Sequence, residues 1–108
     1  MSYNVKSITV FERQAKRLIK KYASLKGELL ALVQELKENP ELGKAIGQNC
    51  YKIRIAIASK GKGKSGGARI ITNFVITDNT VYLLSIYDKS EKDSLTDGEI
   101  NELLKYIP

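Results

Sequence analysis

The side chains of this sequence that could do chemistry are concentrated between Glu41 and Asp78. This stretch contains no acidic residue and seven basic ones, in a chain whose net charge is +6. Its basic residues are Lys44, Lys52, Arg54, Lys60, Lys62, Lys64 and Arg69. Because these charges lie on strand-like and glycine-rich sequence and not on an amphipathic helix, they favour nucleic acid over a membrane as the partner.

The lysine-glycine segment at residues 58–67 and the strands expected beside it suggest individual roles. Arg69 lies just inside the following strand, where its planar guanidinium can be held for bidentate contact with a phosphate. Lys89 ends the adjacent strand, near the same concavity. Tyr87, beside it, is the better functional candidate among the tyrosines, whose rings can stack on RNA bases. The residues expected to bind the RNA backbone are Lys52, Arg54, Lys60, Lys62 and Lys64.

Several function classes are disfavoured by composition. Histidine is absent, which removes the usual general base at neutral pH and the commonest metal ligand. With Cys50 as the single cysteine, we expect neither an internal disulfide nor a transition-metal site, and we predict no cofactor. The sequence shows no signal segment and no run of about 18 apolar residues, so the expected location is a reducing cytoplasm.

Two nucleotide-binding patterns occur in the glycine-rich segment and are rejected. Residues 61–66 match G-x-G-x-x-G, and residues 63–65 resemble the end of a phosphate-binding P-loop. Both motifs place phosphate at the start of a helix that follows a strand. Here the sequence that follows, at residues 68–76, is β-branched and strand-like.

The elements that must position these residues belong to the α+β class, in a single domain spanning residues 1–108. The expected order is β-α-α-β-β-β-α, an antiparallel sheet packed against an N-terminal helical hairpin and a C-terminal helix. Capping boxes at Thr9 and Thr96 are expected to begin the first and last helices. The expected strands are residues 4–9, 51–57, 68–76 and 80–87, and residues 41–49 are expected to be a loop.

Two segments, Gly63–Ile71 and Ile86–Glu91, resemble the HigB-type branch of the RelE/ParE toxin superfamily. The resemblance implies a toxin of a type II toxin–antitoxin module that cleaves mRNA, typically in the ribosomal A site. Arg69 falls on the family's strand arginine, which contacts the scissile phosphate. Lys89 falls where RelE has a second active-site arginine. The family's C-terminal tyrosine has no counterpart, since Leu95 stands nearest to its position.

The chemistry implied by this resemblance is metal-free attack of a ribose 2′-OH on the adjacent phosphate. The general base is left open between Tyr87, a carboxylate and one of the loop lysines Lys60, Lys62 and Lys64. Like-charge repulsion among such lysines would lower their pKa values. Lys62 and Lys64 are therefore candidate catalytic residues, with Arg69 and Lys89 as electrostatic stabilisers.

Two other functions fit the same sequence: a ParE-like toxin that inhibits gyrase, and a non-catalytic basic RNA-binding module. The cationic loop favours the ribonuclease, because a toxin that targets a protein does not need a phosphate-binding cradle. The expected partners are the ribosome, mRNA and a cognate antitoxin, taken to be a helix-turn-helix protein. No membrane partner is expected.

Overall fold

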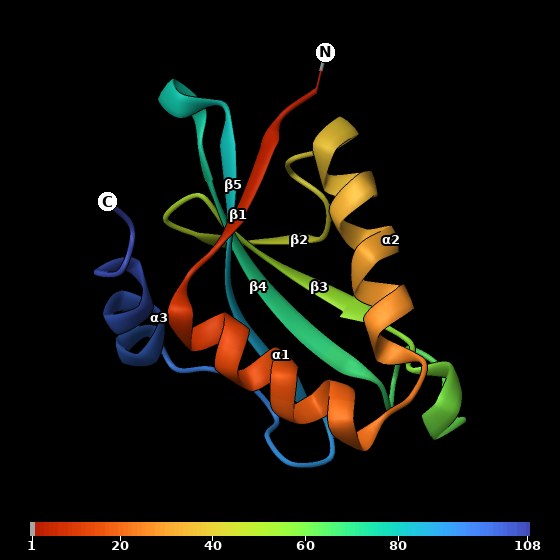
Figure 1. Ribbon diagram of the computed structural model, residues 1–108. Coiled ribbons are helices and arrows are strands. Elements are labelled where there is room, and N and C mark those ends of the chain that lie inside the picture. Colours follow the sequence, from red (N-terminus) through yellow and green to blue (C-terminus); the bar gives the residue numbers. More distant parts are fainter. Residues whose placement is uncertain (1) are drawn as a thin grey trace.

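Five strands form one sheet in the order β1-β5-β4-β3-β2 in the computed structural model, which describes residues 2–108 (Figure 1). The strands are β1 (Asn4–Ser7), β2 (Lys44–Gly47), β3 (Cys50–Ile55), β4 (Ala68–Val75) and β5 (Thr80–Asp88). The helices are α1 (Thr9–Lys21), α2 (Leu25–Glu38) and α3 (Asp97–Leu104). Two short 3-10 turns are η1 (Ala58–Lys60) and η2 (Ile76–Asp78). The predicted α+β class is confirmed.

The sheet is mixed, and not antiparallel throughout as expected. Strands β2 to β5 pair in antiparallel fashion, whereas β1 pairs in parallel with the first half of β5. A parallel neighbour needs a long crossover connection. The chain between β1 and β5 contains two helices and three strands, which provide that connection.

The prediction of a loop at residues 41–49 is wrong for β2. Residues Lys44–Gly47 pair with the start of β3. The turn between the two strands has positive φ at Gly47, Gln48 and Asn49 (93°, 56° and 58°). Glycine and asparagine tolerate this conformation, so they build a hairpin turn here. The residues that indicated a loop are therefore those that reverse the chain.

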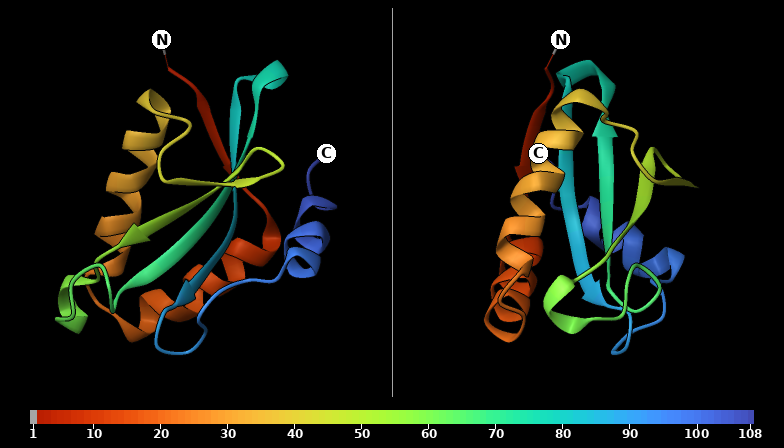
Figure 2. Two further views of the ribbon diagram at one scale, coloured as in Figure 1. Left: turned by 180° about the vertical axis from the view of Figure 1, so that it is seen from behind. Right: turned by 90° about the vertical axis from the view of Figure 1, so that its right-hand side faces the viewer.

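Helices cover the two faces of the sheet unequally. Figure 2 shows α1 and α2 on one face and α3 on the other. Phe11, Ala15 and Leu18 recur with helical spacing along α1, and all three are buried. Full burial of each large apolar side chain is worth about 1.5–3 kcal/mol, so this face fixes α1 on the sheet. Within residues 2–108, no helix has both the length and the apolar character needed to cross a bilayer.

The two predicted capping boxes have different outcomes. The box that begins α3 is confirmed, because the Thr96 hydroxyl accepts from the Glu99 amide (3.1 Å) and the Glu99 carboxylate accepts from the Thr96 amide (2.9 Å). The box at Thr9 is wrong, since Ile8 is the N-cap and makes no side-chain cap. The Ile8 amide still donates to the Leu83 carbonyl (3.2 Å), so pairing with β5 decides where α1 begins.

Candidate nucleic-acid interface

Three side chains of the predicted site lie in register across β3, β4 and β5. Arg54 is opposite Arg69, and Arg69 is opposite Tyr87. Directly opposed residues of antiparallel strands share a face, with Cβ atoms about 4.5–5.5 Å apart. The adjacent row, Ile53–Ile70–Ile86, points to the other face and is buried in the core. Two guanidinium groups and a phenol therefore lie side by side on the face opposite α1 and α2.

Arg69, expected to be held for contact with a phosphate, is covered by the lysine-glycine loop. Its Nη1 donates to the carbonyls of Lys64 (2.8 Å) and Ala68 (3.2 Å), and its Nη2 donates to the carbonyl of Ser65 (3.3 Å). Only 5% of the residue is exposed. Burial, and then the neighbouring Arg54, lower the pKa of Arg69. An arginine keeps its charge in proteins, and three hydrogen bonds leave part of its five-donor fork for an anion.

Two glycines allow the loop to close over Arg69. A Cβ atom on Gly67 would overlap the carbonyl oxygen of Ile55, and one on Gly66 would lie 2.6 Å from Cβ of Lys62. Neither position has room for a side chain unless the backbone shifts. Gly66 and Gly67 thus serve close packing, and the stem of Lys62 rests on the first of them.

A groove of about 600 Å³ follows the edge of β3 beside this row. Strand β2 pairs with β3 only as far as Lys52, so the second half of β3 has no strand on that side. The cations lining the groove are Lys44, Lys52, Arg54 and Lys64, and Glu35 is the acidic residue among its lining side chains. The structure thus brings three predicted site residues together and adds Lys44. Its place in the acid-free stretch was the sequence signal for it.

Tyr87 combines burial with an unused polar atom. The residue is 6% exposed, and within residues 2–108 no group hydrogen-bonds to its hydroxyl. Burial raises the pKa of Tyr87, with Arg69 opposing the shift and Glu99 adding to it. The phenol is therefore protonated at neutral pH, which suits a hydrogen-bond or proton donor and not a base. Tyr82, by contrast, is a core residue, and the Tyr51 hydroxyl donates to Glu41 (2.8 Å).

Lys60 does not join the other loop lysines. Its Nζ lies 2.6 Å from Oδ1 of Asp88 and 3.1 Å from the Ser90 hydroxyl, and its side chain is 10% exposed. Asp88 is fully buried and also accepts from Tyr22 and from the Ser90 amide (2.9 Å) and hydroxyl (2.7 Å). Lys60 was expected to bind the RNA backbone with the other loop lysines, but its ammonium is instead paired with the carboxylate of Asp88. The Lys60–Asp88 ion pair connects η1 to the end of β5, and the hydrogen bond from Tyr22 to Asp88 connects both to the end of α1.

The protonation of Asp88 predicts acid sensitivity. Burial tends to raise the pKa of Asp88, but hydrogen bonds from Lys60, Tyr22 and Ser90 outweigh it and hold the pKa far below its ordinary value. A depressed pKa contributes stability above the unfolded value of about 3.9, and this stability is lost as the pH falls below it. We expect the free energy of urea unfolding to fall between about pH 5 and pH 2, and to fall less in Asp88→Asn. Identical pH profiles would contradict this assignment.

Lys62 and Lys89 lie at the margin of the site. Lys62 is exposed on the loop. The backbone amide of Lys89 donates to the Gly67 carbonyl (3.0 Å), which joins the end of β5 to the loop. Its ammonium pairs with Asp93. Across residues 2–108, no three side chains of metal-ligand type form a cluster that could hold a metal ion.

Comparison with known proteins identifies a family model that matches this chain and solved structures with a similar fold. A family model described as the RelE toxin of the RelE / RelB toxin–antitoxin system matches residues 8–107. The fold is similar to a free-state mutant of the Escherichia coli toxin RelE, with a TM-score of 0.63 and 21% identity over 100% of both chains.

Two toxin–antitoxin complexes are also similar. The intact E. coli RelBE complex gives a TM-score of 0.62 and 18% identity over 81% of this chain and 96% of that one. The RelBE2 complex from Mycobacterium tuberculosis gives a TM-score of 0.60 and 15% identity, over 82% of this chain and 99% of that one. These structures support the fold, and the family match spans nearly the whole sequence. The chain therefore belongs to the RelE toxin family of the RelE/ParE toxin–antitoxin superfamily.

Proposed function

We propose that this RelE-family toxin is a ribosome-dependent mRNA endoribonuclease of the HigB-type branch. The observation that carries the proposal is the row Arg54–Arg69–Tyr87 beside a cationic groove. The groove offers positive charge to the backbone of a single strand. Arg54 is exposed, and once the loop that covers Arg69 opens, the row can offer two guanidinium groups and a protonated phenol to one phosphate of that strand.

The reaction supported by these groups is transesterification. The ribose 2′-oxygen attacks phosphorus, its proton passes to a base, and a 2′,3′-cyclic phosphate forms as the bond to the 5′-oxygen breaks. Arg69 and Arg54 stabilise the extra negative charge of the phosphorane. Tyr87 gives its proton to the departing 5′-oxygen. Lys62 or Lys64 accepts the 2′-proton in its neutral form, and Lys89 adds positive charge at the margin.

The proposed dependence on the ribosome rests on the scarcity of general acid and base residues at this site. The chain contains no histidine, so catalysis must come mainly from charge and from orientation of the RNA. Holding reacting groups in the correct geometry can supply about 7–11 kcal/mol of the barrier. In this proposal the ribosome supplies that geometry, in the cytoplasm where mRNA is translated.

A cognate antitoxin is the second partner in this proposal. The E. coli RelBE and M. tuberculosis RelBE2 structures are toxin–antitoxin complexes. We infer that this chain is likewise neutralised by an antitoxin, which we take to be a helix-turn-helix protein. The acid-free stretch between Glu41 and Asp78 would speed association with an acidic segment of that antitoxin.

Replacing Tyr87 with phenylalanine is expected to separate activity from stability. Cleavage should fall by about 10²-fold or more, because a positioned acid contributes about 10²–10⁴-fold. The free energy of unfolding should not fall, since an unpaired buried hydroxyl itself costs about 1–3 kcal/mol. Single-turnover cleavage and urea unfolding measure the two effects. A variant that cleaves at the wild-type rate would remove Tyr87 from the mechanism.

Induction of the chain in cells tests the proposed function. We expect growth arrest and cleavage of a reporter mRNA, and we expect the same transcript to stay intact when its ribosome-binding site is deleted. Cleavage of both transcripts would contradict ribosome dependence. Growth arrest with intact mRNA and altered DNA supercoiling would instead identify a gyrase inhibitor.

A further inference from the structure

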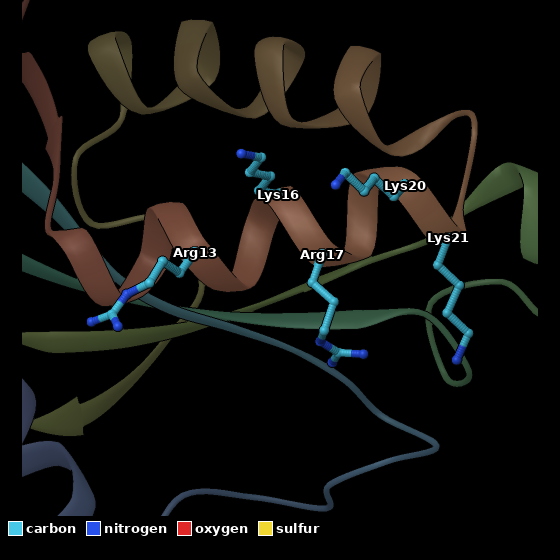
Figure 3. Close-up of a pocket in the computed structure, with 5 residues that line it drawn as sticks. All are labelled: Arg13, Lys16, Arg17, Lys20 and Lys21. Carbon is cyan, nitrogen blue, oxygen red and sulfur yellow. The ribbon is translucent and has the colours of Figure 1, made fainter.

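The exposed face of α1 carries a row of basic side chains that the proposed catalytic site does not use. They line a shallow depression of about 490 Å³, and Figure 3 shows their side chains along the helix. They are Arg13, Lys16, Arg17, Lys20 and Lys21. This spacing of three and four residues places them on one side of the helix, away from its buried apolar stripe. We call these five residues the α1 stripe.

The charge of the α1 stripe is only partly neutralised. Glu91, in the segment after β5, lies 2.7 Å from Arg17 and 3.4 Å from Lys21. No carboxylate within residues 2–108 comes within 4.0 Å of the basic groups of the other three members, Arg13, Lys16 and Lys20. Like charges three and four residues apart disfavour a helix. A face that keeps this repulsion is suited to an anionic partner.

The form of the α1 stripe fits the backbone of double-stranded RNA. From Arg13 to Lys21 the helix rises about 12 Å, so the cations stand along a straight, rigid element. None of the five lining side chains is aromatic, whereas unpaired strands are held largely by base stacking. Duplex RNA is recognised by its shape and phosphates, which needs no stacking. Insertion into a membrane would need the apolar face of α1, which is buried against the sheet.

The α1 stripe is separate from the groove beside β3. Figure 2 shows α1 on the same face of the sheet as α2, whereas the row Arg54–Arg69–Tyr87 lies on the opposite face. We propose that the α1 stripe is a second RNA-binding surface, which docks on the phosphate backbone of an RNA duplex. Its link to the ribosome rests on the proposed function: the duplex would be ribosomal RNA that holds the toxin while mRNA enters the groove.

Binding to uncleavable probes tests the proposal. The probes are a duplex of 2′-O-methyl RNA and an unpaired strand of the same length, which lack the attacking hydroxyl. The stripe variant carries Arg13→Gln, Lys16→Gln and Lys20→Gln in the full chain. The control variant loses the same charge elsewhere, through Lys6→Gln, Lys37→Gln and Lys105→Gln. Urea unfolding verifies that both variants are folded, which is expected because glutamine is a good helix former.

We expect the stripe variant to bind the duplex at least 10-fold more weakly than the control variant does. The slope of log affinity against log salt should decrease by about 2–3, since each lost phosphate contact removes about one. Affinity for the unpaired strand should be the same in the two variants. Equal duplex affinity in the two variants would overturn the proposal. So would a defect confined to binding phosphatidylglycerol vesicles, which would identify a membrane surface.

The outcome is independent of the test of cleavage. Suppose that the stripe variant loses duplex binding, but that translated mRNA stays intact in cells that express the wild-type chain. The proposed nuclease activity is then wrong, and the second RNA-binding surface is supported. Suppose instead that the wild-type chain cuts mRNA in cells, but that the stripe variant binds the duplex as tightly as the control variant does. The nuclease activity is then supported, and the second RNA-binding surface is wrong.

Discussion

Replacing Arg69 with alanine is expected to reduce cleavage of ribosome-bound mRNA by about 10²–10³-fold, the usual cost of losing one preorganised charge-stabilising donor. Arg69 lies between Arg54 and Tyr87, and the loop carbonyls hold its fork in place. In the proposed mechanism the loop opens, and the fork of Arg69, positioned by β4 between Arg54 and Tyr87, stabilises the charge of the phosphorane. Rates of single-turnover cleavage on ribosomes measure the effect.

Two further variants make the Arg69 result specific. Arg69→Lys keeps the charge but loses the planar fork, so we expect a defect of at least about 10-fold, because lysine cannot make bidentate contact. Lys37→Ala, on α2, should cleave at the wild-type rate. Circular dichroism must show that Arg69→Ala is folded, since Arg69 also anchors the loop at Lys64 and Ser65. A folded Arg69→Ala protein with wild-type toxicity would exclude Arg69 from the site.

Replacing Asp88 with asparagine is expected to destabilise the protein by about 3–5 kcal/mol, the usual cost of breaking one side of a buried ion pair. The substitution leaves the ammonium of Lys60, which is 10% exposed, without its carboxylate. It also weakens the hydrogen bonds from Tyr22 and Ser90. The free energy of urea unfolding near neutral pH measures the loss.

Controls separate burial from charge in this prediction. Glu91→Gln removes a carboxylate from an exposed pair and should cost less than about 1 kcal/mol. The double variant Lys60→Met, Asp88→Leu should be more stable than Asp88→Asn, because no unpaired buried charge remains. An Asp88→Asn protein within about 1 kcal/mol of wild type would show that the Lys60–Asp88 pair does not stabilise the fold.

Local sequence patterns were sufficient to predict most of the elements. The periodicity of Phe11, Ala15 and Leu18 identified the buried face of α1, and Thr96 with Glu99 identified the start of α3. The failures occur where pairing between distant segments overrides a local pattern. Thr9 does not cap α1, because Ile8 is still bonded to β5. Residues 44–47 form a strand because β3 pairs with them.

The site was predictable in its residue types but not in its arrangement. Lys52, Arg54 and Lys64, which the acid-free stretch indicated as RNA-binding residues, line one groove. Lys60 is close to Lys62 in sequence, but Asp88, 28 residues away, binds it. The burial of Tyr87 depends on its neighbours in the folded chain, and no local pattern signals it. Closeness in sequence is therefore a poor guide to which charged side chains contact each other in the folded chain.

A reconstituted cleavage reaction tests the central claim most directly. Purified chain is added either to free mRNA or to the same mRNA bound in ribosomal initiation complexes with an empty A site, and primer extension maps the cuts. We predict cuts in the A-site codon of the bound mRNA and far fewer cuts in free mRNA, and we predict that Arg69→Ala cuts the bound mRNA about 10²–10³-fold more slowly than the wild-type chain. Efficient cutting of free mRNA, or intact bound mRNA after treatment with the wild-type chain, would contradict the claim.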